Sequence, residues 1–411
     1  MKVSYLSHIT ILAIAALLFT CSLNEPEKNS QILVQPISLT FTKNVTSKKS
    51  IISNYGGGKL SWQIADKPDW IEVSKSSGKV TTGKDTITVT ADINQETGTY
   101  SGTISITSNG GNKGVTVFLN LETWITRRSM PTARYSFATC VLDEKIYAIG
   151  GKDGRNYLTA MEVYDPATDM WTKKSAMPTA RSCLTSCVLE GKIYAIGGEN
   201  NNGFKSSVEI YDPVTDSWSS GVALPLPLVL LSCNVVDGKI YAIGGVWSYS
   251  AGEGDHPTYE FDPNTGQWTE KRKMPTLRAG HGACVIDSKI YTFGGVGLHV
   301  AFRDLEVYNP ATDSWEIKNK MPASRFYFGS GEVNGKIYAI GGSRIPPSLL
   351  SVVEEYDPST DTWLKKTDMP TARWGLSSCT VNGQIFVIGG AKSTSEDAEA
   401  FSIVEAYDPE S

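Results

Sequence analysis

The sequence predicts an all-β protein in which a small immunoglobulin-like β-sandwich precedes a six-bladed β-propeller. Two observations carry this prediction. A unit of roughly fifty residues recurs six times after residue 122, and residues 31–122 contain runs in which apolar and polar residues alternate. The chain has 411 residues, of which 40% are hydrophobic, and this is enough for two buried cores.

Each repeat contains Ile-Tyr-Ala-Ile-Gly-Gly or a close variant of it. The glycine pairs end at Gly151, Gly198, Gly245, Gly295, Gly342 and Gly390. An aromatic residue then opens an Asp-Pro-like turn at Tyr164, Tyr211, Phe261, Tyr308, Tyr356 and Tyr407. Seven residues later, five repeats have a tryptophan: Trp171, Trp218, Trp268, Trp315 and Trp363. Residues 123–411 therefore resemble the Kelch repeat family, and the resemblance implies a propeller of four-stranded blades.

The blades are expected to close into a ring through both ends of this region. One blade cannot bury its two faces alone, so neighbouring repeats must pack around an axis. The sixth repeat ends before its tryptophan strand, whereas Trp124 precedes Trp171 by one repeat length. We therefore expect residues 124–128 to supply the outer strand of blade six, which removes an exposed sheet edge.

The region ahead of the repeats is predicted to be a separate β-sandwich. Five period-two runs indicate strands at residues 39–41, 59–64, 85–90, 100–107 and 114–121. Turn clusters are expected at residues 56–58, 76–78 and 109–112. The string around Trp62, Trp70 and residues 102–108 resembles the BACON domain, which is common in exported proteins of Bacteroidetes. That resemblance implies either carbohydrate binding or a spacer, and we expect both tryptophans to lie in the core.

The first residues predict export and a lipid anchor. An apolar run from Ile9 to Phe19 is too short to span a bilayer and is typical of a signal peptide, here residues 1–21. Leu18-Phe19-Thr20-Cys21 resembles a lipobox, which implies lipidation at Cys21, with residues 22–30 as a linker. The expected location is the outer membrane, the cell surface or the periplasmic face, with ordinary secretion or a retained anchor as alternatives.

Composition argues against several classes of function. The formal net charge is −5 and no basic run occurs, so we expect no nucleic-acid partner. Beyond the signal segment the three histidines lack the spacing of metal ligands, and no phosphate loop or nucleophile elbow occurs. We expect a monomer without metal, cofactor or catalytic activity, which binds a glycan or a protein and touches a membrane only through its lipid.

Seven cysteines raise the question of disulfides. Four of them occupy one repeated position, at Cys140, Cys187, Cys284 and Cys379. Equivalent positions on neighbouring blades are expected to lie too far apart for a bond, so these four are predicted to be free and to line the lower channel. A bridge that involves Cys183 or Cys233 stays open.

The candidate ligand-binding residues include a set of repeated arginines. Four residues after the methionine of each Met-Pro pair stands an arginine, namely Arg134, Arg181, Arg278, Arg325 or Arg373, and blade three has Leu228 there. In the Kelch family the loops around this position share the face at the channel mouth. The resemblance thus implies five arginines that could hold carboxylates or sulfates, with packing between blades as the alternative role.

Aromatic residues complete the candidate site. Trp247 and Tyr249 lie in an insertion at residues 246–256, and Tyr327 and Trp374 follow repeated arginines in blades five and six, where residues 391–401 form a second insertion. Aromatic and charged groups at a mouth suit a glycan or an acidic peptide. The alternative function is an enzyme resembling the Kelch sialic acid epimerases, for which the acid/base candidates are His281, Glu253 and Glu396.

Overall fold

The computed structural model describes residues 29–411 except 44, 96–97, 122, 248–256, 298–299, 346, 396–397 and 410–411, and the side chain of Asn120. The described residues form two compact units, one up to Leu121 and one from Thr123 onward. Several residues singled out in the sequence lie outside the described part: Cys21, Tyr249, Glu253, His256 and Glu396. No helix within the described residues is long and apolar enough to cross a membrane.

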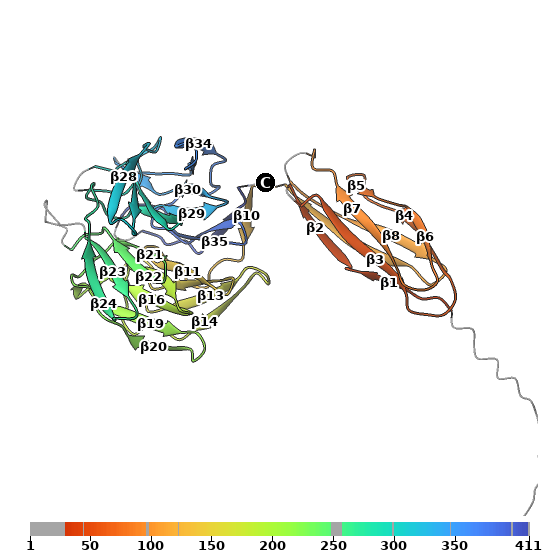
Figure 1. Ribbon diagram of the computed structural model, residues 1–411, viewed down its shortest axis with the longest axis horizontal. Helices are drawn as coiled ribbons and strands as arrows, with labels where there is room; N and C mark the ends of the chain where they lie inside the picture. Colours follow the sequence, from red (N-terminus) through yellow and green to blue (C-terminus); the bar gives the residue numbers. More distant parts are fainter. Residues whose placement is uncertain are drawn as a thin grey trace, which may run out of the picture. The chain divides into compact units, whose positions relative to one another are not determined.

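The N-terminal unit contains nine strands in two sheets (Figure 1). The four-stranded sheet has the order β1 (Ile32–Gln35), β3 (Ser47–Asn54), β7 (Lys84–Ala91), β5 (Ile71–Val73). The five-stranded sheet has the order β2 (Ser38–Thr42), β9 (Lys113–Asn120), β8 (Thr99–Ser108), β4 (Leu60–Asp66), β6 (Ser77–Val80). The β2–β9 pair is parallel, and the other pairs are antiparallel.

The two sheets share one hydrophobic core, because alternate side chains of each strand point inward. Trp62 belongs to this core with 3% of its surface exposed, and its indole N–H donates to the Asp85 carboxylate over 3.2 Å. Trp70 is half-buried against the same core and lies 6.3 Å from the Tyr100 ring. The core position expected for Trp62 is confirmed, and Trp70 occupies its edge.

One turn predicted in this unit is wrong. Residues 76–78 were expected to form a turn because of their serines and glycine, but Ser77–Val80 form strand β6. Gly78 pairs with Trp62 across the sheet, and a Cβ on Gly78 would lie 2.7 Å from the indole ring. The glycine is therefore needed for close packing against tryptophan and not for a turn.

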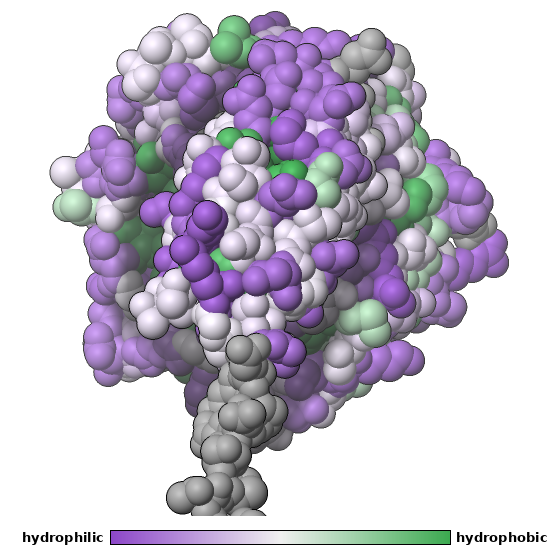
Figure 2. All heavy atoms as spheres, turned by 90° about the vertical axis from the view of Figure 1, so that its right-hand side faces the viewer, coloured by the Kyte–Doolittle hydropathy of each residue, from purple (hydrophilic) through white to green (hydrophobic). Residues whose placement is uncertain are grey.

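Most strand-borne apolar side chains of the N-terminal unit lie in its core, and Figure 2 views the protein from one end, with both units in sight. The face seen in Figure 2 is dominated by hydrophilic and intermediate residues, with apolar residues in small separate patches. Ile37 is the most exposed large apolar residue among the described residues of the N-terminal unit, at 70%. Single exposed apolar residues of this kind are normal for soluble proteins.

The C-terminal unit contains six four-stranded antiparallel sheets, which we call blades one to six (Figure 1). Blade one consists of β11 (Ala138–Leu142), β12 (Lys145–Ile149), β13 (Met161–Asp165) and β14 (Met170–Lys174). Blade two consists of β15 (Thr185–Leu189), β16 (Lys192–Ile196), β19 (Val208–Asp212) and β20 (Ser217–Ser220). Blade three consists of β21 (Ser232–Val236), β22 (Lys239–Ile243), β23 (Thr258–Asp262) and β24 (Gln267–Lys271).

Blade four consists of β25 (Gly282–Ile286), β26 (Lys289–Phe293), β27 (Leu305–Asn309) and β28 (Ser314–Lys318). Blade five consists of β29 (Gly329–Val333), β30 (Lys336–Ile340), β33 (Val353–Asp357) and β34 (Thr362–Lys366). Blade six consists of β35 (Ser377–Val381), β36 (Gln384–Ile388), β37 (Val404–Tyr407) and β10 (Trp124–Arg127). Two short hairpins are added by β17 (Glu199–Asn200) with β18 (Gly203–Phe204), and β31 (Ser343–Arg344) with β32 (Ser348–Leu349).

The six inner strands lie next to one another in a closed circuit, in the order β11, β15, β21, β25, β29, β35 and back to β11. Each space between two blades is filled by apolar side chains from both. Between blades six and one, for example, Phe386 and Ile388 pack with Ile146 and Tyr164. The channel at the centre of this circuit holds the candidate functional site.

Blade six combines both ends of the region. Its outer strand β10 pairs antiparallel with β37, with Trp124 opposite Tyr407. The Trp124 indole N–H donates to the Thr367 carbonyl over 3.2 Å, as Trp171 donates to the Arg128 carbonyl over 2.9 Å in blade one. Trp124 thus makes the contact that the repeat tryptophans make in the other blades.

Candidate functional site

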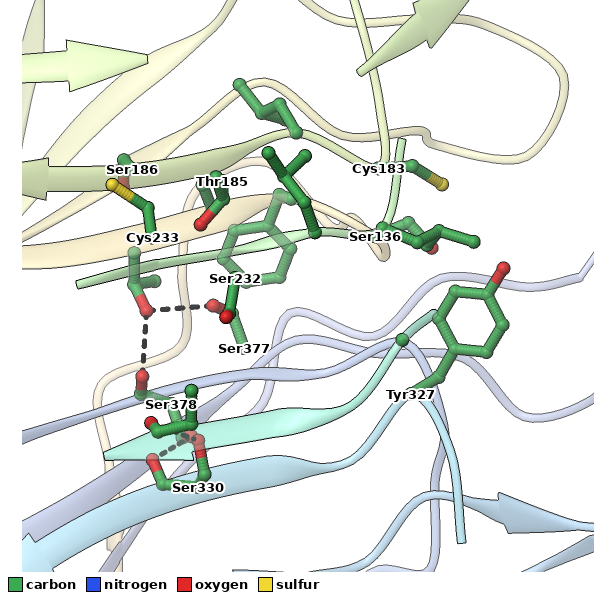
Figure 3. A pocket seen from close by; sticks show the side chains of 18 of the residues that line it. Ser136, Cys183, Thr185, Ser186, Ser232, Cys233, Tyr327, Ser330, Ser377 and Ser378 are labelled. Carbon is green, nitrogen blue, oxygen red and sulfur yellow. Dashed lines mark hydrogen bonds between the residues drawn. The ribbon is translucent and has the colours of Figure 1, made fainter. Parts of the chain in front are cut away.

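A cavity of about 220 Å³ occupies the centre of the six inner strands (Figure 3). All six blades contribute to its wall, since each inner strand presents its first residues and the segment just before it. Ser136, Cys183 and Tyr327 lie on one side of the view, and Ser186, Cys233 and Ser378 lie on the other. Among the described residues that line this cavity there is no lysine, arginine, aspartate or glutamate.

Hydroxyl groups dominate the polar part of the wall. They belong to Ser136, Thr139, Thr185, Ser186, Ser232, Tyr327, Ser330, Ser377 and Ser378. Some form hydrogen bonds across blades: the Thr139 and Ser377 hydroxyl oxygens are 2.8 Å apart, and the Ser378 hydroxyl donates to the Ser330 backbone carbonyl over 2.8 Å. A hydroxyl donates and accepts, so this wall can adapt to neutral polar groups.

The backbone forms a closed ring of hydrogen bonds at the start of the inner strands. The N–H of Ser136 donates to the Gly375 carbonyl over 2.7 Å, and the same bond recurs between every pair of neighbouring blades, with lengths from 2.7 to 2.9 Å. The six residues in this backbone ring are Ser136, Cys183, Leu230, Gly280, Tyr327 and Gly375. All six have φ between 51° and 62°. Every blade is thereby fixed at the same height around the channel.

Two of the predicted aromatic residues meet at the end of the cavity that Tyr327 lines. The rings of Tyr327 and Trp374 are 5.1 Å apart and nearly perpendicular, and Trp374 also packs against Tyr135 at 5.7 Å. The Trp374 indole N–H donates to the Ser393 carbonyl in the blade-six insertion. Tyr135 was missed in the sequence, although it follows Arg134 just as Trp374 follows Arg373.

Trp247 lies on the loop that follows Gly245 in blade three and is 43% exposed. The neighbouring Val246 forms an isolated bridge with Val229, which precedes the inner strand. Equivalent bridges join Tyr135 to Lys152 and Trp374 to Ala391. The loop after each glycine pair therefore lies beside the loop that enters the inner strand, on one face of the blades.

The repeated arginines do not lie at the mouth. All five side chains have no exposed surface: Arg134, Arg181, Arg278, Arg325 and Arg373. Each guanidinium binds a buried glutamate and the carbonyl of the first glycine in the Gly-Gly pair of its own blade. For Arg181 these bonds are 2.9 Å to Glu209 and 3.0 Å to Gly197. Because these guanidinium groups are fully buried and bound inside their blades, the structure favours the packing role that the sequence left as the alternative over the ligand-binding role.

The partner glutamates were not identified in the sequence. They stand two residues before the repeat tyrosines, at Glu162, Glu209, Glu306, Glu354 and Glu405, and pair with the arginines in that order. Burial lowers the pKa of Arg181, and the Glu209 carboxylate partly offsets this. The sequence contains a signal for these pairs, because the one repeat without the arginine, in blade three, also lacks the glutamate.

Blade three lacks the ion pair because both partners are replaced. Leu228 stands in place of the arginine and Tyr259 in place of the glutamate, and both are buried. In other blades a threonine hydroxyl also donates to the glutamate, as Thr179 does to Glu209 over 2.5 Å, whereas blade three has Leu226. Uncharged side chains at the same repeat positions can therefore replace the buried arginine–glutamate pair within the same fold.

The cysteines depart from the sequence prediction. Cys140, Cys187 and Cys284 are buried in the cores between blades and do not line the described cavity. Cys183 and Cys233, which fall outside the repeated set, do line it. Side chains on an inner strand alternate between the two neighbouring blades, so the repeated position faces a blade and not the axis.

His281 is the acid/base candidate that the described structure places in the cavity wall. Its Nε2 atom is 3.1 Å from the Ser232 hydroxyl oxygen. No group of three or more histidine, cysteine, aspartate or glutamate side chains in the described part of the chain is arranged to hold a metal ion. The described wall of the cavity thus combines hydroxyl and aromatic groups with two thiols, the Asn234 amide and one imidazole.

Sheets of four strands around a hydroxyl-lined axis define a propeller of Kelch type. A model described as the KLHDC2/KLHL20/DRC7 Kelch-repeats domain matches residues 70–245 and 224–390, and the Kelch motif matches residues 373–411. The chain therefore belongs to the Kelch-repeat family.

Comparison with solved structures gives the same fold. A solved structure described as Structure of YjhT has a TM-score of 0.60 and 19% sequence identity, and the match covers 68% of this chain and 96% of that one. At this level of identity the likeness extends to the fold alone. Comparison with curated protein sequences finds no match.

Proposed function

We propose that this chain is an exported, lipid-anchored scaffold that binds a glycan at the channel mouth of its propeller without catalysis. In this proposal Cys21 carries the lipid. The six sheets are the blades of a six-bladed Kelch propeller, and residues 31–122 form an immunoglobulin-like sandwich of the BACON type that serves as a spacer. The protein acts as a monomer.

The observation that carries the proposal is the combination of an uncharged hydroxyl wall with aromatic rings at its end. Sugars offer hydroxyls that pair with serine and threonine, and C–H faces that stack on aromatic rings. Tyr327 belongs to the cavity wall and Trp374 packs against it. A cavity of about 220 Å³ is smaller than a drug-sized pocket, and this suits one terminal sugar unit.

Charge favours a neutral glycan over an acidic ligand. An acidic group would need a cation with free donors, and the five arginines use theirs inside the blades. The hydroxyl wall lacks lysine and arginine among its described residues. Trp247, on its exposed loop, is proposed as a further stacking residue outside the cavity, and Tyr249 as another on the same loop.

The proposal is tested with a glycan array of neutral and acidic glycans and the purified chain. Tyr327→Ala and Trp247→Ala should each weaken binding at least tenfold, whereas Ile317→Ala on outer strand β28, where the side chain is 68% exposed, should not. Thermal melting separates a lost contact from a lost fold. If the chain bound none of the glycans, a glycan would be rejected as the ligand class. Capture of a protein partner would then make a protein the proposed ligand.

The alternative is an enzyme that resembles the Kelch sialic acid epimerases. The observation in its favour is the His281 imidazole beside the Ser232 hydroxyl in the cavity. An imidazole can move a proton near neutral pH, as ring opening of a sugar requires. NMR would show faster exchange between the anomers of free sialic acid, lost in His281→Ala. An unchanged exchange rate would exclude this function and leave the binding scaffold.

A further inference from the structure

Two cysteines from neighbouring blades meet beside the channel. Cys187 is the third residue of inner strand β15 in blade two, and Cys233 is the second residue of β21 in blade three. Their sulfur atoms are 2.6 Å apart. A disulfide bond needs about 2.05 Å, so the closing movement is only about half an ångström.

The same junction recurs around the propeller with different side chains. At three other junctions the third residue of one inner strand contacts the second residue of the next, and a thiol there meets a hydroxyl. These contacts join Cys140 to Ser186, Cys284 to Ser330 and Cys379 to Thr139. Within the described residues, the junction between blades two and three is the place where thiol meets thiol. The fold therefore brings these two positions into contact at each of these junctions. Only at this one among them does a thiol, that of Cys233, replace the hydroxyl of the other three.

We propose that Cys187 and Cys233 form a disulfide that links blades two and three when the protein meets a thiol oxidant. The sequence left open a bridge that involves Cys233, because the predicted separation applied only to equivalent positions on neighbouring blades. Cys233 is not at the equivalent position, since it stands one position earlier on its strand than the repeated cysteines stand on theirs.

The two cysteines differ in access. Cys233 is half-buried and lines the cavity, whereas Cys187 is 7% exposed within the core between the blades. Burial raises the pKa of the Cys187 thiol well above its usual value, so Cys187 is a poor first nucleophile. Cys233 reacts first and Cys187 resolves the intermediate.

The reaction with a small organic disulfide is balanced in two exchanges. The Cys233 sulfur, having lost its proton to water, attacks one sulfur of the oxidant, forms a mixed disulfide and releases one small thiol. The Cys187 sulfur then loses its proton and attacks the Cys233 sulfur, which breaks the mixed disulfide and releases the second small thiol. Two protein thiols are oxidised by two electrons, and one oxidant molecule is reduced to two thiols.

The test treats the purified chain with excess hydroxyethyl disulfide, then blocks the remaining thiols and maps peptides by mass spectrometry. We expect a linked peptide pair that contains Cys187 and Cys233, and the loss of two thiols. The bond closes a loop of 46 residues, so oxidation should raise the melting temperature by about 5 °C or more, reversibly with reductant.

Cys233→Ser is the matched control, because it restores the thiol–hydroxyl contact of the other junctions and should fold normally. This variant should lose the linked peptide and the oxidation-dependent rise in melting temperature. Conversely, Ser186→Cys places a second thiol against Cys140 and should yield a second linked peptide. Recovery of both native peptides blocked at Cys187 and Cys233 after oxidation would overturn the proposal. So would an undiminished loss of two thiols in Cys233→Ser.

Discussion

The backbone N–H of Ser136 donates a 2.7 Å hydrogen bond to the carbonyl of Gly375, and this bond helps to join the first blade to the last. It is one of six equivalent bonds that run around the channel. Because each donor also accepts from the next blade, moving one blade outward would break two bonds. The backbone ring therefore holds the cavity wall at a fixed width, and its left-handed backbone conformation is a feature of the site.

Gly280 allows the cost of this left-handed conformation to be measured. Its φ is 57°, and a Cβ there would find its nearest neighbour at an ordinary 3.6 Å, so steric overlap does not complicate the result. We expect Gly280→Ala to lower the free energy of unfolding by about 1 kcal/mol and Gly280→Val by about 2, because left-handed backbone is costly for residues with a Cβ.

Gly280→Asn is the control, since asparagine tolerates this conformation better than alanine. Urea unfolding followed by circular dichroism measures the order, which should be glycine, asparagine, alanine, valine from most to least stable. An asparagine variant less stable than the alanine variant would show that contacts, and not backbone conformation, decide stability at this position.

The buried ion pair of blade two should be replaceable by the apolar pair of blade three. Arg181→Leu alone leaves the Glu209 carboxylate buried without its partner, and we expect a loss of about 3–5 kcal/mol. The double variant Arg181→Leu with Glu209→Tyr copies Leu228 and Tyr259, and should lie within about 2 kcal/mol of the native chain.

A double-mutant cycle in urea separates these effects. The coupling between the two substitutions should be large and favourable, because each single variant leaves one charge unpaired. If the double variant were as unstable as the sum of the two single variants, the ion pair would not be exchangeable, and blade three would need another explanation.

Asp216 should make stability depend on pH. The Tyr211 hydroxyl donates to its carboxylate over 2.6 Å and the Ser175 N–H over 3.0 Å, and these bonds lower the pKa of Asp216. A carboxyl whose pKa is lowered in the folded state stabilises the fold above its unfolded pKa, about 3.9. That stabilisation is lost as pH falls through the lower folded pKa.

We therefore expect Asp216→Asn to melt at a lower temperature than the native chain at pH 7, with the difference shrinking below about pH 4. Thermal melts from pH 3 to pH 7 provide the measurement. Asp165→Asn, in the turn of blade one, is a control for removing a turn carboxylate that accepts from the Ala167 N–H in the same turn and pairs with Lys145. A difference for Asp216→Asn that stays constant over this range would contradict the assigned role.

Much of the fold could be predicted because strands and turns repeat in register. The Ile-Tyr-Ala-Ile-Gly-Gly strand and the tryptophan strand appear at the expected positions, as β12 and β14 do in blade one. In the N-terminal unit, β3 was missed because its first half, Ser-Lys-Lys-Ser, is polar and only Ser50 and Ile52 point inward.

The candidate site was harder to predict for two physical reasons. Alternation assigns the arginines to one face of a strand but does not say whether that face meets solvent or the blade, and the partner of Arg181 is 28 residues away. The backbone ring involves unrelated side chains such as Leu230 and Tyr327, so no residue type marks it. Tyr327 and Trp374 could be identified because each stands within two residues of a repeated arginine, Tyr327 two positions after Arg325 and Trp374 one position after Arg373.

Trp124 provides the sharpest test of how the propeller closes. Its ring lies 4.9 Å from Tyr407, and it connects the beginning of the C-terminal unit to strand β37 near its end. Trp218 makes the same contacts in blade two, 5.3 Å from Tyr211, but within one continuous blade. Both are half-buried, so we expect Trp124→Ala and Trp218→Ala to cost a similar 2–3 kcal/mol, about half to two-thirds of a fully buried tryptophan.

The two variants should differ in where the structure opens. In Trp218→Ala the outer strand β20 remains tied to its blade by the turn at residues 213–216, so hydrogen exchange should rise only locally. In Trp124→Ala, strand β10 has no such turn to β37, and exchange should rise along both β10 and β37. Equal exchange patterns would mean that closure depends on the inner backbone ring alone, with the outer strand contributing only its own contacts.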